Sequence, residues 1–403
     1  MWTVSRVLWN GPGEVVDKAV RDTPGRLAGR ALTSENGRAH GVDRKDPSGE
    51  QEQRVPEQPE QPEQVDPVAV LRRIAFLLER RMADTFRIKA YRGAAAALLE
   101  VGGDEVRSRA EAASLRELPG VGAKTAAIVA ECVAGEVPSY LLKLEETGGP
   151  LDEDGAEHRA ALRGDLHAHS DWSDGGSPIE EMAMTAVEVG HEYLVLTDHS
   201  PRLTVANGLS VERLTRQLDV VAAVDEQLGA SGGFRLLSGI EVDILDDGSL
   251  DQTEEMLDRL DVVVASVHSK LRMDGPAMTR RMLAAVRHPR TNVLGHCTGR
   301  LITGGRGVRP QSSFDAEVVF TACAERGVAV EVNSRPERSD PPDELIDVAL
   351  EAGCLFSIDS DAHAPGQLDF LSYGAARTQR LGVPLDRIVN TWPVDRLLEW
   401  ANG

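Results

Sequence analysis

The first patterned segment of the chain predicts amphipathic helices. From Asp66 onward, apolar residues recur at the three- and four-residue spacing of one helix face: Val68, Leu71, Ile74, Leu77 and Leu78. Asp66 can cap this helix, and Pro67 suits its first turn. The following stretch, "DTFRIKAYRGAAAALLEV", predicts a second helix. Residues 66–145 are therefore expected to form a small all-α domain.

The second half of the chain shows a different pattern, in which short β-branched runs alternate with helical stretches. The runs are "GDLHAHS", "EYLVLTDHS", "FRLLSGIEVDI", "LDVVVASVHS", "TNVLGHCTGR", "GVAVEVNS" and "CLFSIDSDAH". Strands separated by helices of this length indicate βα units and a parallel sheet. Seven such runs predict an α/β fold, a distorted (β/α)7 TIM-like barrel over residues 162–403.

Two segments lack either pattern. Residues 1–65 are rich in Gly, Arg, Glu, Gln and Pro and end near the repeat "PEQPEQPEQ". Such a segment buries too little apolar surface to offset its chain entropy, so it is predicted to be a disordered tail. Residues 146–161 are acidic and glycine-rich, and they are expected to link the helical domain to the barrel.

Ligand-type side chains stand at the ends of six predicted strands. They are His167, His169, His199, Glu241, His268, His296, Asp361 and His363. Two close histidines alone are equally compatible with a surface accident. In an extended strand, however, His167 and His169 point to the same side, and βα barrels carry their chemistry at the carboxyl ends of the strands. The repetition over six strands predicts a metal centre at that end.

Composition and charge narrow the choice of partners. The net charge of −21 argues against a generally basic nucleic-acid surface, although a local positive patch could still bind phosphates. The cysteines show no CxxC pairing, so small buried thiols are expected rather than disulfides: Cys132, Cys297, Cys323 and Cys354. There is no run of about 18 apolar residues and no apolar leader segment. A cytoplasmic protein without a membrane partner is expected.

The stretch "LRELPGVGAKTAAIVAECVAGEV" places a glycine turn between a short helix and a longer one starting near Ala123. The free backbone N–H groups at such a helix start can hold a phosphate oxygen. Alternatively, the turn simply joins two packed helices. Together with "FRIKAYRGAAAAL", it resembles the helix-hairpin-helix of the amino-terminal eight-kilodalton domain of family X DNA polymerases.

This resemblance implies binding of gapped DNA or of DNA 3′ ends. The candidate DNA contacts are Gly120, Val121, Gly122 and Lys124. Some family members cut abasic sugars with a lysine that lies four residues after the position of Lys124. Ile128 stands there in this chain, so lyase activity by that route is not expected.

The barrel half resembles the PHP domain, the polymerase and histidinol phosphatase family of metal-dependent phosphoesterases. The resemblance is carried by "GIEVDILDDGSLD", "ASVHS", "LGHCTGRL" and "NTWP", which are similar to the carboxy-terminal PHP domain of bacterial family X polymerases. The linker is too short to hold the nucleotidyltransferase palm of those polymerases. The resemblance therefore implies a phosphoesterase without polymerase activity.

The PHP resemblance also implies three divalent ions, Zn or Mn with Fe as a further possibility, and a metal-bound hydroxide as the nucleophile. The implied ligands are His167, His169, Glu241 and Asp361 for one ion, Glu241, His268 and His296 for a second, and Asp174, His199 and His363 for the third. The nearby Asp171 is assigned a loop role because the family position matches Asp174.

Cationic side chains near the barrel mouth are candidates for phosphate binding, although each could equally be an ordinary surface ion pair: Arg272, Arg300 and Arg338. Asn333 either shapes the pocket or has a structural role. The family often has an asparagine where Arg335 stands, so contacts to substrate are expected to differ there.

Three functions are compatible with these features. The first is a DNA end-processing phosphoesterase, acting as a 3′–5′ exonuclease, a 3′-phosphatase or an abasic-site nuclease in repair. The second is a small-molecule phosphatase, for example on histidinol phosphate. The third is a non-catalytic DNA-binding or scaffolding protein in which metal only stabilises the barrel. The helix-hairpin-helix segment and the full set of ligand positions favour the first.

Overall fold

The computed structural model describes residues 65–403 except 231 and 306, and these belong to one compact unit, Glu60–Gly403. The predicted tail lies outside the described residues, apart from Val65. The first elements are helical: α1 (Pro67–Arg80), α2 (Thr85–Val101), α3 (Gly103–Glu111), the 3-10 turn η1 (Leu115–Glu117), α4 (Ala123–Val133), α5 (Ser139–Glu146) and α6 (Ala156–Ala161).

The following elements alternate strands with helices. The strands are β1 (Gly164–Ala168), β2 (Tyr193–Leu196), β3 (Arg235–Asp243), β4 (Val262–Ser266), β5 (Val293–Leu294), β6 (Ala329–Asn333) and β7 (Leu355–Asp359). The helices are α7 (Ile179–Glu188), α8 (Val211–Gly229), α9 (Glu254–Leu257), α10 (Gly275–Val286), α11 (Ala316–Arg326), α12 (Asp343–Ala352), α13 (Leu371–Arg380) and α14 (Val394–Asn402). The 3-10 segments are η2 (Thr204–Ala206), η3 (Pro365–Phe370), η4 (Leu385–Arg387) and η5 (Val389–Thr391).

Helix α1 begins as its sequence predicts. The Asp66 carboxylate accepts a hydrogen bond from the N–H of Val68 at 2.9 Å, and Pro67 occupies the first turn. The apolar face of α1, including Leu71, Ile74 and Leu77, is buried in one cluster with residues of α2, α4 and α5. The predicted helical segment therefore has a core of its own.

The glycine turn before α4 also matches its prediction. Gly120 has a φ of 81°, in the left-handed region that favours glycine, and a Cβ there would lie 3.3 Å from the carbonyl oxygen of Gly93. Gly122 forms the N-cap of α4, and its N–H donates to the Thr125 hydroxyl at 2.9 Å. The turn is thus held between α2 and α4.

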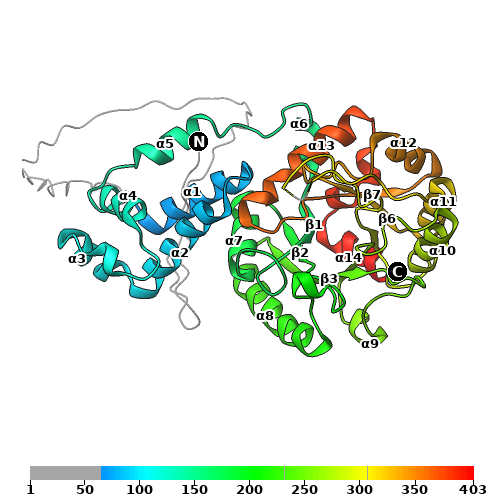
Figure 1. Cartoon of the computed structure of the whole chain (residues 1–403), viewed down its shortest axis with the longest axis horizontal. Helices are drawn as coiled ribbons and strands as arrows, with labels where there is room; N and C mark the ends of the chain where they lie inside the picture. The colour runs from blue at the N-terminus through cyan, green and yellow to red at the C-terminus, as the bar shows by residue number, and fades with distance from the viewer. Residues whose placement is uncertain (1–64, 231, 306) are drawn as a thin grey trace, which may run out of the picture. The chain divides into compact units, whose positions relative to one another are not determined.

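The seven strands form a parallel sheet in the sequential order β1 to β7. A parallel bridge joins Ala168 to Ala362, where the N–H of His169 donates to the Ala362 carbonyl at 2.8 Å. The sheet is therefore a nearly closed barrel, with helices such as α8, α10, α11 and α12 on its outside (Figure 1). This confirms the predicted seven-stranded α/β barrel.

Two apolar layers hold the barrel together. Inward residues such as Leu166, Val195 and Val264 form a buried cluster of their own. A larger cluster joins the outer faces of the strands to the surrounding helices. The barrel centre is therefore filled by side chains, which leaves the carboxyl ends of the strands as the place for a site.

The end of the predicted linker is ordered. Residues Ala156–Ala161 form the helix α6, and the His158 ring nitrogen Nδ1 lies 2.9 Å from the Thr378 hydroxyl of α13. A Cβ at Gly155 would lie 2.2 Å from the backbone nitrogen of Ala376, so this position needs glycine. The segment expected to link the two domains thus ends in a helix that packs on α13, a partner that the sequence of the segment does not show.

All four cysteines are free and buried, as predicted. Among the residues that the structure describes, no helix combines the length and the apolar character that crossing a bilayer requires.

Candidate metal centre

The Glu241 carboxylate, in β3 and 1% exposed, lies at the centre of a ring of imidazoles. Its two oxygens face nitrogens from four other strand ends. From Oε1, the distances are 3.2 Å to His268 Nε2 and 2.8 Å to His296 Nε2. From Oε2, they are 2.8 Å to His199 Nδ1, 3.4 Å to His167 Nε2 and 3.7 Å to His169 Nε2.

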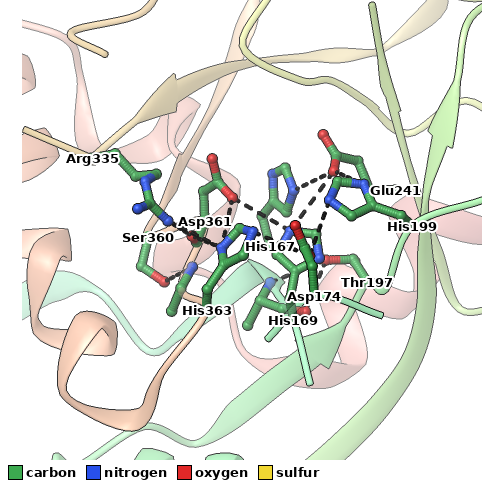
Figure 2. A network of polar contacts seen from close by, with 12 residues as sticks. His167, His169, Asp174, Thr197, His199, Glu241, Arg335, Ser360, Asp361 and His363 are labelled. Atoms are coloured by element: carbon green, nitrogen blue, oxygen red, sulfur yellow. Dashed lines mark hydrogen bonds and ion pairs between the residues drawn. The ribbon is translucent and has the colours of Figure 1, made fainter. Parts of the chain in front are cut away.

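A second group adjoins the first on the side of β7. Asp174 Oδ1 lies 3.4 Å from Nε2 of both His199 and His363, and Asp361 Oδ1 lies 3.4 Å from Nε2 of His169 (Figure 2). The structure therefore brings together all nine residues that the sequence analysis selected as ligands.

The barrel itself explains this convergence. His167 lies in β1, Glu241 in β3, and the other ligand positions follow their strands within a few residues. Parallel strands in a barrel end at the same rim, so side chains far apart in sequence meet there. Asp174 comes from the loop between β1 and α7, while Asp361 has a φ of 51°, a left-handed conformation that a non-glycine residue seldom adopts.

The donor atoms fit divalent ions. Buried atoms without a hydrogen-bond partner in the described part of the chain include both Glu241 oxygens and ring nitrogens of His167, His169, His199, His268 and His296. Such atoms are costly to bury unless something else binds them. Three groups of residues each place their donor atoms within 4.8 Å of one another. They are His169, Asp174, His199 and His363; His167, His169 and Glu241; and His199, Glu241 and His268. Mixed imidazole and carboxylate donors suit Zn, Mn or Fe.

The electrostatics of the cluster favour paired opposite charges. Burial disfavours the charged form of Glu241, but the positive charges of His268, His167 and His199 outweigh burial and hold its pKa well below the usual range. Burial would likewise lower the pKa of His199, yet Glu241 and Asp174 raise it to about 10. The site therefore strongly favours positive charge next to Glu241, whether it comes from protons or from metal ions.

Three buried carboxylates behind the candidate ligands were missed by the sequence analysis. Glu331 Oε1 lies 2.6 Å from Nδ1 of His167. Asp243 Oδ1 lies 3.4 Å from Nδ1 of His268. Asp198 accepts hydrogen bonds from Ser170 and Ser173 in the loop that leads to Asp174. A signal existed in "VAVEVN", where a lone carboxylate interrupts an apolar strand. Such partners orient metal-binding imidazoles.

The three candidate arginines differ in position. Arg338 Nε lies 3.1 Å from Asp361 Oδ2, so it borders the cluster. Arg300 Nε donates to the Ser339 carbonyl at 2.9 Å, so the Arg300 side chain holds the loop after β6. Arg272 is exposed on the loop after β4. Of these three arginines, Arg338 is therefore the one with a contact to a candidate ligand among the described residues.

Asn333 and Arg335 both reach the segment after β7. The Asn333 amide donates to Asp361 Oδ2 at 3.1 Å and to Glu331 Oε2 at 3.2 Å. Arg335 Nη1 donates to the Asp361 carbonyl at 2.8 Å and lies 3.0 Å from His363 Nδ1 (Figure 2). Asp171, by contrast, is exposed in its loop, and its N–H donates to the Ser177 carbonyl at 2.9 Å.

The candidate DNA contacts lie on the turn before α4. Gly120, Gly122 and Lys124 are exposed, whereas the Val121 side chain is 6% exposed and belongs to the helical core. Val121 can therefore offer only backbone groups to DNA. Ile128 is 5% exposed in the same core, so its position presents an apolar side chain to the interior.

Comparisons with known proteins match both halves of the chain. Residues 165–335 match the PHP domain, and residues 63–137 match a helix-hairpin-helix domain. The chain thus has a match to a helix-hairpin-helix domain followed by a match to a PHP domain.

Among its relatives is the DNA polymerase/3′-5′ exonuclease PolX of Bacillus subtilis, 34% identical over 229 residues, or 57% of this chain. The matched part spans 39% of the length of that protein. A probable phosphatase of a Thermoanaerobacter species is 26% identical over 242 residues, which cover 56% of this chain and 89% of the relative.

One solved structure is similar to the chain at a TM-score of 0.39 and 19% identity, covering 55% of this chain and 94% of its own. It is the histidinol phosphate phosphatase of Lactococcus lactis, complexed with Zn, L-histidinol and phosphate.

Proposed function

We propose that this protein is a metal-dependent phosphoesterase that hydrolyses phosphate esters at DNA ends, as a 3′–5′ exonuclease, a 3′-phosphatase or an abasic-site nuclease. The observation that carries the proposal is the buried Glu241 carboxylate, whose two oxygens and the ring nitrogens that face them, such as His167 Nε2 and His296 Nε2, have no hydrogen-bond partner in the described residues. Three divalent ions, Zn or Mn with Fe as a further possibility, are the proposed occupants. The proposed ligands are His167, His169, Asp174, His199, Glu241, His268, His296, Asp361 and His363.

Bound divalent ions would lower the pKa of a coordinated water and stabilise charge on a phosphoryl group. The chain supplies the rest of the site. Glu241 holds its two oxygens between the imidazole groups, and Glu331 fixes the ring of His167. Arg338, 3.1 Å from Asp361, is the cation best placed to bind an oxygen of the substrate phosphate.

The DNA part of the proposal rests on the helical domain. Its turn presents exposed backbone at Gly120 and Gly122, at the N-terminus of α4, together with the exposed Lys124. A helix start of this kind favours a phosphate oxygen, and contacts with phosphates need no basic surface over the whole protein. The similarity to the DNA polymerase/3′-5′ exonuclease PolX of Bacillus subtilis is consistent with such a substrate.

A small-molecule phosphatase is the second candidate. It is favoured by the probable phosphatase of a Thermoanaerobacter species, which aligns with this chain over 89% of its own length. The helix-hairpin-helix segment is the feature that this alternative leaves without a role.

The test is release of nucleotide or phosphate by the full chain with Mn, in parallel on gapped DNA with 3′-hydroxyl or 3′-phosphate ends and on histidinol phosphate. Lys124→Ala should lower kcat/KM on DNA by about fivefold to tenfold, as expected for loss of one phosphate contact, and leave the small ester unaffected. Lys143→Ala is the matched control, since Lys143 is an exposed lysine of the same helical domain on α5. Turnover of histidinol phosphate alone would favour the second candidate and contradict the first.

A further inference from the structure

Helix α1 contacts the segment that follows β7, where two of the proposed ligands lie. Glu79, near the end of α1, is 1% exposed, and its Oε2 accepts a hydrogen bond from the N–H of Gly366 at 2.8 Å. Gly366 belongs to η3 and is three residues from His363. The helical domain thus reaches the backbone of the ligand segment directly.

The backbone of α1 packs so closely on Gly366 that there is no space for a side chain at this position. A Cβ on Gly366 would lie 2.3 Å from the Phe76 carbonyl oxygen and 2.7 Å from the Glu79 Cβ. Arg80 adds a second link, with its Nε 2.6 Å from Asp369 Oδ2. The whole of η3 is therefore fixed against α1 by backbone packing and by charge.

Glu79 is also charge-paired, which explains how a carboxylate can be buried there. Arg92 donates to both of its oxygens, at 2.9 Å from Nε and 2.7 Å from Nη2. A bidentate arginine and a backbone N–H together satisfy the carboxylate. On its other side, Arg92 Nη1 lies 3.2 Å from Glu181 of α7.

The path from Glu79 to a proposed ligand is short. Gln367, next to Gly366, accepts a hydrogen bond from the N–H of His363 at 2.8 Å. Holding the Gly366 backbone therefore holds Gln367, and Gln367 holds the backbone of His363. No side chain of α1 touches the proposed ligands in the contacts described, so any effect of Glu79 on them acts through η3.

We propose that Glu79 is a positioning residue for the metal centre, which makes α1 of the DNA-binding domain a structural part of the phosphoesterase site. The inference rests on the proposed function, because it takes His363 as a metal ligand. Partners that orient ligands contribute about tenfold to hundredfold to metal affinity. Because Glu79 acts through Gly366 and Gln367, about tenfold is expected.

The experiment measures Mn binding to the full chain by equilibrium dialysis, and the Mn concentration for half-maximal hydrolysis of bis(p-nitrophenyl) phosphate. Glu79→Ala should raise both values about tenfold, with kcat at saturating Mn within twofold of the unaltered protein. Because loss of one partner of a buried ion pair can prevent folding, the Glu79→Leu/Arg92→Leu variant serves as a second test. It keeps the apolar packing and removes the acceptor for Gly366.

Glu181→Ala is the matched control, since it breaks the contact of Arg92 with α7 and leaves Gly366 bonded to Glu79. Its Mn dependence should stay within twofold of the unaltered protein. An equal shift in Glu181→Ala, or no shift in a folded Glu79 variant, overturns the positioning role. If the unaltered protein neither binds Mn nor hydrolyses the ester, the proposed function fails together with this inference.

Discussion

Glu331 links two of the proposed metal ligands from inside the barrel. Its Oε1 lies 2.6 Å from His167 Nδ1, and its Oε2 accepts from the N–H of His296 at 2.5 Å. The first contact fixes which nitrogen of His167 faces the centre, because Nδ1 must carry the proton that it shares with the carboxylate. Nε2 is then free to bind a metal.

Glu331→Gln should therefore weaken metal binding about tenfold to hundredfold while keeping the side-chain volume. The measurement is the Mn concentration for half-maximal ester hydrolysis, together with direct Mn binding. Glu192→Gln is the control, because it removes a carboxylate from an ion pair with Arg163 just before β2. An unchanged Mn dependence in Glu331→Gln would show that this carboxylate only fills space.

His191 provides a pH-dependent contribution to stability away from the cluster. It is 5% exposed, and its ring nitrogens have no hydrogen-bond partner among the described residues. Burial, with a smaller effect from Arg159, lowers the pKa of His191 to about 3. Below pH 6.5 the unfolded chain therefore binds a proton that the folded chain excludes, so stability is lost as the pH falls from about 6.5 towards 3.

Because of this imidazole, the free energy of unfolding should be about 2 kcal/mol lower at pH 5 than at pH 7. His191→Leu removes the titrating group, so its stability should fall less than that of the unaltered protein by that amount over the same interval. Urea unfolding at the two pH values measures the difference. Parallel losses in the two proteins would mean that His191 becomes protonated without unfolding.

At the scale of elements, the sequence predicted what depends on local periodicity. The seven strands and the helix α1 with its Asp66 cap follow from alternation, spacing and capping, and the strand-end positions of the proposed ligands follow from the strands. The helix α6 and the Glu79–Gly366 contact depend instead on which distant surface each segment meets. No spacing within one segment encodes that information.

Glu331 shows where the prediction of the site ended. Strand β6 is five positions from β1 in the sheet order, and only the barrel closure brings its Glu331 close to His167 of β1. The sequence marked the carboxylate as unusual but did not identify its partner. Residues at strand ends are predictable because all ends meet at one rim, whereas partners inside the barrel require the register of every strand.

At the scale of the whole molecule, one centre draws on residues from almost the full length of the barrel. Candidate ligands extend from His167 in β1 to His363 after β7, and α1 adds a contact through Gly366. In the unfolded chain these donors are dispersed. An ion that binds them together therefore binds the folded chain and stabilises it by mass action.

We expect that removing divalent ions with a chelator lowers the melting temperature, and that adding Mn back restores it in proportion to the logarithm of its concentration. At a free concentration of about 100 times Kd, the gain is about 2.7 kcal/mol, which corresponds to roughly 5 °C or somewhat less for a chain of this size.

Asp174→Asn should keep most of the shift but lose ester hydrolysis, because Asp174 is a partly exposed donor at the edge of the cluster. Loss of hydrolysis with the Mn shift retained argues for catalysis. A folded variant that keeps both would show that hydrolysis does not need Asp174, whereas a variant that no longer folds would argue for a metal that stabilises the barrel. The absence of any Mn shift in the unaltered protein would contradict the metal centre itself.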